Sequence, residues 1–364
     1  MKRTKKKTTR NILFVALVIF SFLFVSSTAI AENNAKPIVL KVTSFLPPPN
    51  VSLGSAILKW WEDEVSKRTN NSITFENFWS GALASGAGHL KLVQDGSVQV
   101  AHTYHWYTTS NFPIADLEYV FPFGPTDYEL VVKAMKKLHS EFPQFKKDHD
   151  KQNVVLVSDP PGSTYRFMSK TAVKSLSDFK GKRIGLVGRY FGRWLPPGAS
   201  AVVRPGPQRY ELMRNGVIDI DLNPFDQQYS FKIHELAKYC LDIEPLTGTW
   251  GCVLMNKDTF DSLPKETQDI VLEVGRESEL RAARETIPAY WNKIQEEWKD
   301  AGVEIVAFPQ EDIEKWVAGL EDIPAEWAAE IEKLGYPGFE IVKRWQEITS
   351  ELGFKWAREW GKRK

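Results

Sequence analysis

The sequence predicts an α/β protein built from two similar lobes. Residues 38–103 alternate apolar strands with helical segments in a β-α-β-α-β order, which is typical of a parallel sheet with helices on its faces. The same alternation restarts at residue 153 and runs to residue 222. The chain that follows residue 31 is also longer than a single hydrophobic core usually serves.

The elements of the first lobe follow from residue periodicity. Near-alternating β-branched residues in "IVLKVTSF" indicate a strand, and "LPPPN" ends it. Leu53, Ile57 and Val65 then recur at helical spacing, and Gly96 closes a second helix. We therefore expect strands at 38–45, 72–78 and 98–103, and helices at 52–69 and 89–95.

The second lobe is predicted in the same way, and the chain then becomes helical. Gly216 ends one helix, and Pro264 suits the first position of a long helix that continues towards Asp300, with a kink at Pro288. The C-terminal remainder is Trp-rich and amphipathic. We expect strands at 153–158, 165–169, 183–187, 217–222 and 303–308, and a helix at 208–215.

The N-terminus has the three parts of a secretory signal peptide. A basic segment precedes the apolar run 12–25, and small residues lead to a cleavage site after Ala31. An N-terminal membrane anchor is the alternative, but the run is short for spanning a bilayer. We expect residues 1–31 to be removed and the mature chain to be periplasmic.

Charge and cysteine content exclude several classes of partner. Of the 47 basic and 46 acidic residues, six basic and no acidic ones lie in residues 1–31, so the remainder has a net charge of −5 with His neutral. Nucleic acid and anionic membranes are therefore not expected as partners. Cys240 and Cys252 either form one disulfide or are two small buried side chains.

No motif indicates a cofactor, a metal ion or catalysis. The glycine-rich stretch "SDFKGKRIGLVGRYFGRW" lacks the lysine and hydroxyl residue of a phosphate loop. "DIDLN" is followed by Pro224 where a calcium loop needs glycine, and His102 and His105 would point to opposite faces of a strand. The residues after strand 183–187 instead suggest a pocket, because ligands of open α/β sheets lie beyond the carboxyl ends of strands. Arg189 and Arg193 are candidates there.

Five stretches between Ile38 and about Glu311 resemble, in order and spacing, the periplasmic solute-binding proteins of TRAP (tripartite ATP-independent periplasmic) transporters, in the dicarboxylate-type family. They are "VSKRTNNSITFENFWSGALASG", "LVQDGSVQVAH", "FPFG", "YRFMSKTAVKSLSDFKGKRIGL" and "RYELMRNGVIDIDLNPF". The resemblance implies a two-lobed periplasmic binding protein fold (type II-like), with mixed sheets flanked by helices and a long helix bridging both lobes. It assigns residues 38–162 and 250–288 to lobe 1, and 163–249 and 289–364 to lobe 2.

The resemblance also implies which residues bind the ligand. The family's ligand-binding arginine falls at Gly185 in this chain, which departs from the usual carboxylate clamp. The ligand-binding residues that we expect are Arg166, Asn223, Tyr104, Phe45, Trp79, Gly185, Arg189, Arg193 and Trp250.

The function implied is capture of a small organic acid between closing lobes and its delivery to the TRAP membrane permease by a monomer that is not an enzyme. The aromatic residues and the missing arginine favour a monocarboxylate or an aromatic or branched acid over a compact dicarboxylate. A binding protein of an ABC importer or a sensor, or a secreted α/β enzyme, are the alternatives.

Overall fold

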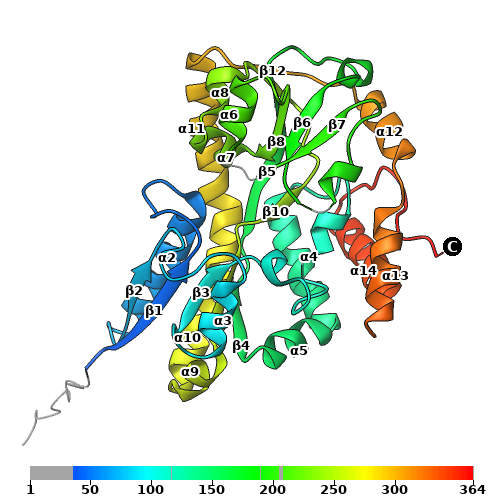
Figure 1. Cartoon of the computed structure of the whole chain (residues 1–364). Coiled ribbons are helices and arrows are strands. Elements are labelled where there is room, and N and C mark those ends of the chain that lie inside the picture. Colours follow the sequence, from blue (N-terminus) through cyan, green and yellow to red (C-terminus); the bar gives the residue numbers. More distant parts are fainter. Residues whose placement is uncertain (1–35, 116, 189, 205–207, 364) are drawn as a thin grey trace, which may run out of the picture. The chain divides into compact units, whose positions relative to one another are not determined.

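The computed structural model describes residues 36–115, 117–188, 190–204 and 208–363, and Ile38–Lys364 form one unit with two sheets (Figure 1). Both sheets are mixed and carry helices on their faces, so the predicted α/β class with mixed sheets is confirmed. The signal peptide predicted over 1–31 lies outside the described residues. None of the described helices is both long enough and apolar enough to cross a membrane.

The first sheet has the strand order β2-β1-β3-β11-β4. β1 pairs in parallel with β2 and β3, as the β-α-β-α-β pattern predicts, whereas β11 runs antiparallel between β3 and β4. Its strands are β1 (Ile38–Ser44), β2 (Ile73–Phe78), β3 (Val100–Thr103), β4 (Val154–Ser158) and β11 (Cys252–Asn256).

The start of one helix near the first sheet and the end of another can be explained from the sequence. Helix α2 (Leu53–Arg68) starts at Ser52, whose hydroxyl accepts a hydrogen bond from the backbone N–H of Ser55. Its Trp61 packs in one apolar cluster with Leu40 of β1. Helix α3 (Gly88–Gln94) is followed by Gly96 at φ +75°, a backbone conformation that favours glycine.

The second sheet is built around β5 (Pro161–Ser169), in which all nine residues are buried. The strand order is β12-β9-β5-β8-β6-β7, and β10 pairs with β5 beside this path. The other strands are β6 (Arg183–Leu186), β7 (Ser200–Val203), β8 (Ile220–Pro224), β9 (Tyr239–Leu241), β10 (Thr247–Thr249) and β12 (Glu304–Val306). Helices α6 (Arg209–Arg214), α7 (Phe225–Ser230) and α8 (Ile233–Leu236) accompany it.

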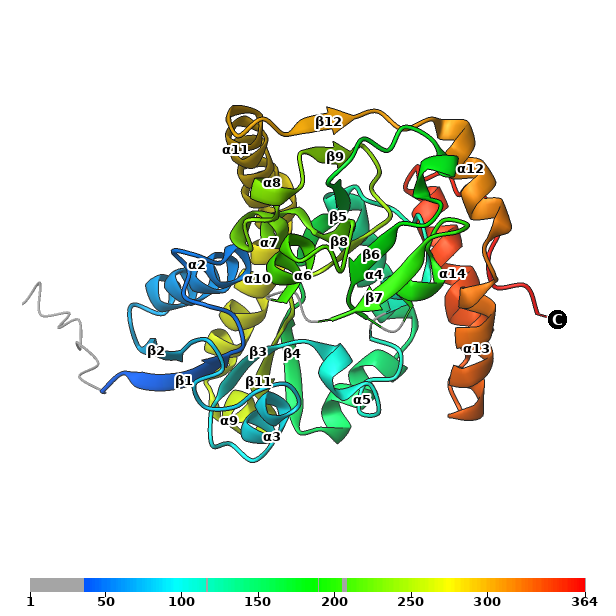
Figure 2. The same ribbon diagram turned by 45° about the horizontal axis from the view of Figure 1, so that its top comes forward.

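The chain passes between the two sheets at three places. Asp159 and Pro160 join β4 to β5, and Trp250 and Gly251 join β10 to β11. The third link is helical: α10 (Lys265–Arg281) packs against α2 and β4 of the first sheet, and α11 (Ile287–Asp300) packs against α7 (Figures 1 and 2). The predicted long bridging helix is therefore present.

A π-helical turn, Ala282–Thr286, joins α10 to α11 directly before Pro288. Proline has no N–H to donate to the carbonyl four residues earlier, so the regular α-helical hydrogen bond cannot form at Pro288. A wider, π-helical turn just before it is a common way to accommodate such an interruption. The kink expected at Pro288 stays a prediction, and the π-helical turn ends two residues before it.

The Trp-rich C-terminal region is helical, as expected, with α12 (Gln310–Gly319), α13 (Ile323–Lys333) and α14 (Gly338–Glu351). Helix α14 packs against α4 (Tyr128–Glu141), and Tyr336 donates a hydrogen bond of 2.7 Å to Asp148 of α5 (Gln144–Lys151). A short helix, α9 (Lys257–Ser262), precedes α10. Cys240 and Cys252 are both buried and form no disulfide.

Candidate functional site

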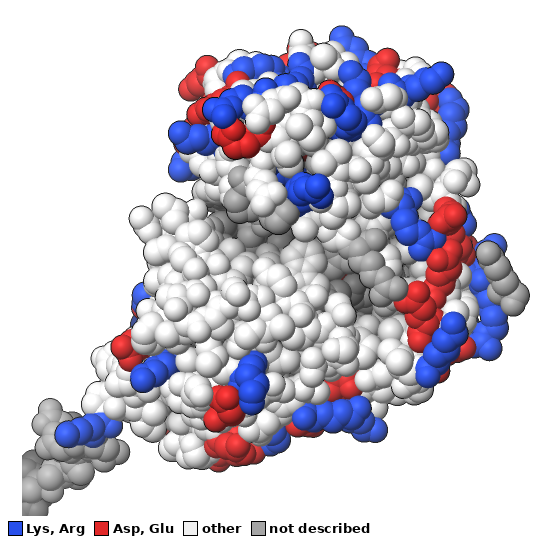
Figure 3. Space-filling model, viewed as in Figure 1, with Lys and Arg blue, Asp and Glu red and all other residues white. Residues whose placement is uncertain are grey.

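A cavity of about 940 Å³ lies where connections from both sheets meet. Its walls come from segments that follow β1, β3 and β6, from the ends of β5 and β8, and from α7, β10 and α13. Several of these segments begin at the carboxyl ends of strands, where open α/β sheets bind ligands. Figure 3 shows a hollow across this view of the molecule, bordered mainly by residues without charge.

The walls of this cavity are strongly aromatic. β1 and β3 run in parallel with Ser44 opposite His102, so the residues that follow each strand emerge side by side. The rings of Phe45 and Tyr104 consequently lie with centroids 4.5 Å apart. The aromatic lining residues are Phe45, Tyr104, Trp106, Tyr107, Phe112, Tyr119, Tyr165, Tyr190, Phe191, Phe231, Trp250 and Trp327. Contacts between the rings hold these walls in place. Aromatic walls of this kind suit a ligand with an apolar body.

A few polar groups on the walls have no partner in the protein. Asn223, at the end of β8, is fully buried, and neither its amide oxygen nor its amide nitrogen is hydrogen-bonded. The indole N–H groups of Trp106 and Trp250 also have no acceptor. Because buried polar groups are nearly always paired, the lack of partners sets these atoms apart from the rest of the walls.

The charged residues on the walls are Asp226 and Glu330, and no Lys or Arg of the described chain lines the cavity. One oxygen of Asp226 has no hydrogen-bond partner, and burial raises the pKa of this carboxyl group to about 7. No sequence pattern indicated Asp226, because only tertiary packing reveals that its oxygen has no partner.

Phe45, Tyr104, Asn223 and Trp250 of the expected residues line the cavity. Their contact with a ligand stays a prediction. Arg189, also expected there, lies outside the described residues, although its neighbours Gly188 and Tyr190 line the cavity.

Arg166 does not line the cavity. Tyr165 does, and neighbouring residues of a strand point to opposite faces. The Arg166 guanidinium pairs instead with Glu244 and, at 3.5 Å, with Asp242, and it stacks 4.3 Å from the ring centre of Trp291. To hold a ligand in this cavity it would have to leave these partners.

Gly185 does not leave open space beside its strand. A Cβ atom there would lie 2.7 Å from Cδ1 of Ile218 and 3.2 Å from Cδ of Arg209. Arg209, which the sequence did not single out, is fully buried, donates to the Gly185 carbonyl at 2.9 Å and pairs with Asp221 at 2.7 Å. The space beside Gly185 is therefore filled by the protein itself.

Trp79 and Arg193 also lie away from the cavity walls. Trp79 packs against the apolar cluster of the first sheet that contains Trp61. Arg193 pairs with Glu321 and, at 2.8 Å, with Glu326 of α13. Arg193 thus ties the segment after β6 to the helix that presents Trp327 to the cavity.

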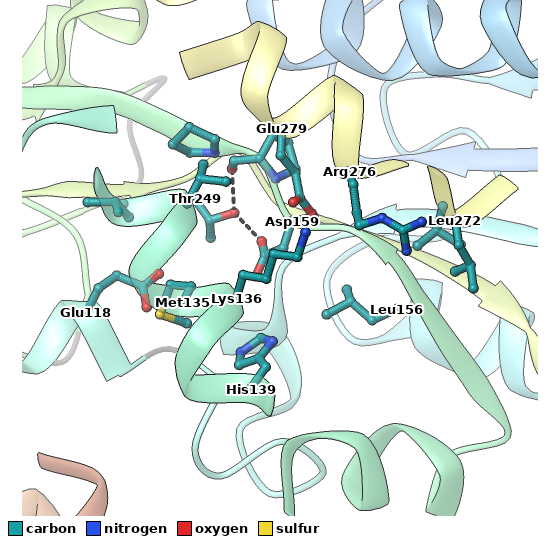
Figure 4. Close-up of a pocket in the computed structure, with 16 residues that line it drawn as sticks. Glu118, Met135, Lys136, His139, Leu156, Asp159, Thr249, Leu272, Arg276 and Glu279 are labelled. Atoms are coloured by element: carbon teal, nitrogen blue, oxygen red, sulfur yellow. Dashed lines mark hydrogen bonds between the residues drawn. The ribbon is translucent and has the colours of Figure 1, made fainter. Parts of the chain in front are cut away.

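A second, smaller cavity of about 180 Å³ adjoins the places where the chain passes between the sheets (Figure 4). Thr249 of β10 donates a hydrogen bond of 2.5 Å to Asp159, and the backbone N–H of Asp159 donates to Glu279 of α10 at 2.8 Å. Burial raises the pKa of Asp159 to about 6 and that of Glu279 to about 7. Thr249 lines both cavities. The hydrogen bonds from Thr249 to Asp159 and from Asp159 to Glu279 therefore link the main cavity to the bridging helix.

Comparisons with known proteins agree with this geometry. The model of the bacterial extracellular solute-binding protein family 7 matches residues 44–330. The monocarboxylate 2-oxoacid-binding periplasmic protein of Nostoc sp. (strain PCC 7120) is 27% identical over 227 residues, which is 57% of this chain and 57% of that relative's length.

Solved structures of TRAP periplasmic solute-binding proteins share the fold. One from Desulfovibrio salexigens, in an open complex, has a TM-score of 0.77 and 18% identity, covering 90% of this chain and 98% of that one. Another, from a marine metagenome and specific for aromatic acid ligands, contains 3-hydroxybenzoate; its TM-score is 0.74 and its identity 23%, with 88% and 100% covered. Because the family model spans most of the sequence, the chain belongs to the bacterial extracellular solute-binding proteins of family 7, the binding proteins of TRAP transporters.

Proposed function

We propose that this protein captures a monocarboxylate with an apolar, aromatic or branched body in the main cavity and delivers it to a TRAP membrane permease. Proteins of this family bind solutes and are not enzymes, and they work with membrane permeases. The observation that carries the ligand class is the cavity of about 940 Å³ with twelve aromatic residues on its walls and no described Lys or Arg.

The balance of contacts supports a large apolar body over a second acid group. Burial of a ring-sized apolar group contributes about 1.5–3 kcal/mol, whereas a typical neutral hydrogen bond contributes about 0.5–1.5 kcal/mol. A second carboxylate would have to lose its water without an arginine on the described walls to replace it. Relatives in the comparison bind monocarboxylate 2-oxoacids and 3-hydroxybenzoate, which fits this class.

The ligand's contacts in this proposal come from both sheets. Phe45, Tyr104 and Trp250 supply the apolar wall, and Asn223 supplies an amide to the polar end. We assign residues 38–162 and 250–288 to lobe 1 and the remaining parts, 163–249 and 289–364, to lobe 2. Closure would then follow from ligand contacts made to both lobes at once.

The protein is further proposed to act as a periplasmic monomer after removal of a signal peptide at Ala31. The basic, apolar and small-residue segments of residues 1–31 support this processing. Mass spectrometry of the protein recovered from the periplasm tests it, with a mature N-terminus at Glu32 as the expected result.

A thermal-shift screen of the purified protein against monocarboxylates and dicarboxylates tests the function. Ligands that bind the folded state raise the melting temperature by mass action. We expect the largest shifts from monocarboxylates with aromatic or branched bodies, and we expect the best ligand to be recovered chemically intact. Product formation in proportion to protein concentration would instead indicate an enzyme.

A further inference from the structure

The main cavity contains a carboxyl group whose hydrogen bonding the protein completes only in part. Asp226, near the start of α7, is 4% exposed, lines the cavity and has one oxygen with no hydrogen-bond partner. Among the described residues no Lys or Arg forms an ion pair with it. A buried acceptor left without a donor costs about 1–3 kcal/mol, so the unpartnered oxygen of Asp226 would gain from a donor on a ligand.

Asn223 precedes Asp226 by three residues and lines the same cavity. Its side chain is fully buried, and both of its amide atoms lack partners. The pair thus presents two oxygen acceptors and one N–H₂ donor to the cavity. Two unpaired polar side chains three residues apart, in a cavity with twelve aromatic residues on its walls, form a built polar subsite.

The charge of this subsite selects the kind of group that it can hold. The backbone N–H of Gln227 and the hydroxyl of Ser163 lie against the Asp226 carboxyl group, but burial outweighs them and raises its pKa to about 7. A second carboxylate placed here would repel Asp226. A hydroxyl or ammonium group would supply the missing donor and favour the ionised form of Asp226.

We propose that Asp226, with Asn223 beside it, recognises a hydrogen-bond-donating group, a hydroxyl or an ammonium, on the apolar organic acid that the cavity binds. This assignment rests on the proposed function and narrows its ligand class to hydroxy or amino acids in the chemical sense. The acid group of the ligand then lies away from Asp226, and the apolar body lies against rings such as Tyr104 and Trp250.

Three probes with one skeleton test the assignment: 3-phenylpropionate, 3-phenyllactate and phenylalanine, which carry H, OH and NH₃⁺ at the same carbon. In calorimetric titrations of the wild-type protein we expect at least one donor-bearing probe to bind about tenfold or more tightly than 3-phenylpropionate. The aliphatic set 4-methylpentanoate, 2-hydroxy-4-methylpentanoate and leucine repeats the comparison for a branched body.

Two variants then locate the preference. Asp226→Leu keeps the branched shape of the side chain but has no acceptor, so the donor-bearing probes should lose their advantage over 3-phenylpropionate measured on the same variant. Asp226→Asn keeps an acceptor without charge, so it separates the sources: a hydroxyl ligand loses little affinity, whereas an ammonium ligand loses most of it. Asp63→Leu, at an α2 side chain that is 65% exposed, is the matched control and should leave every affinity unchanged.

The possible failures can be told apart. If no organic acid binds, the proposed function falls and takes this assignment with it. If acids bind but both skeletons lack a donor preference, or if Asp226→Leu retains the preference, the assignment alone is overturned. Should Asp226→Leu not fold, the wild-type comparison and the isosteric Asp226→Asn still decide.

Discussion

At the scale of single residues, the two neighbours Tyr165 and Arg166 have opposite surroundings. Tyr165 faces the cavity, whereas Arg166 is 4% exposed and contacts Glu244, Asp242 and Trp291. The family resemblance places an arginine of this strand on the ligand. The geometry places its charge in a network within the protein.

Arg166→Lys distinguishes these two roles. Lysine keeps the charge but loses the planar fork and the stacking on Trp291. From the geometry we expect a lower free energy of unfolding and an affinity within about threefold of wild type. An affinity loss of about tenfold or more by calorimetry would instead place the guanidinium on the ligand.

Gly185→Ala tests the packing beside β6. The new Cβ would lie 2.7 Å from Cδ1 of Ile218, in a core where Arg209 is also held by Asp221. Overpacking of this kind costs about 1–3 kcal/mol, which urea unfolding can measure. The control is Gly319→Ala, because no heavy atom lies within 4 Å of a Cβ at that position. Equal stabilities for both variants would show that the core beside Gly185 yields freely.

The cavity residues differ in how far the sequence could identify them. Phe45 and Tyr104 follow parallel strands that are neighbours, so their place at one edge of the sheet could be predicted. Trp79 also follows such a strand, yet it is partly buried against the apolar cluster of the first sheet, because strand order alone does not say where each side chain points. Arg209 could not be singled out, because its role depends on contacts with Gly185 and Asp221 that only the fold creates. Asp226 could not be singled out either, because the lack of a partner for its oxygen is visible only in the folded structure.

At the scale of elements, the predicted boundaries were most accurate where a helical repeat extends over many residues or where a glycine marks the end of a helix. Helix α2 begins one residue after its predicted start, and Gly96 and Gly216 both follow helix ends. Strand β11 was missed, although it completes the first sheet between β3 and β4. Its place depends on antiparallel pairing with strands about a hundred or more residues away, which no local pattern encodes.

The bridging helix carries a titratable contact at the passage between the sheets. Burial raises the pKa of Glu279 from 4.5 to about 7, so the folded state holds a proton that the unfolded chain releases at lower pH. Stability therefore falls as the pH rises between about 5 and 7. The hydrogen bond from the Asp159 backbone N–H lowers the pKa of Glu279, as do Lys136 and Arg276, whereas the charge of Asp159 raises it.

Glu279→Gln should flatten this pH dependence. The change in unfolding free energy per pH unit should decrease by up to about 1.4 kcal/mol between about pH 5 and 7, because one proton no longer participates. Urea unfolding at several pH values measures it. Glu285→Gln is the control, because that side chain is 68% exposed. Parallel pH profiles for wild type and Glu279→Gln would show that Glu279 does not titrate in this range.

At the scale of the whole molecule, the two sheets, the strand crossings and the bridging helix place one large cavity between elements of both sheets. The cavity combines aromatic walls with Asn223 and Asp226, and its described walls contain no Lys or Arg. The aromatic walls are the basis for expecting an organic acid with an apolar body instead of a small dicarboxylate.

Calorimetric titration of the purified protein with benzoate, 3-phenyllactate, succinate and malate tests this expectation most directly. We expect one site per chain, with at least one of the aromatic monocarboxylates bound about tenfold or more tightly than either dicarboxylate. The same ligand should bind Phe45→Ala more weakly, because the apolar wall is lost. A clear preference for succinate or malate, or binding that is unaffected by Phe45→Ala, would contradict the account.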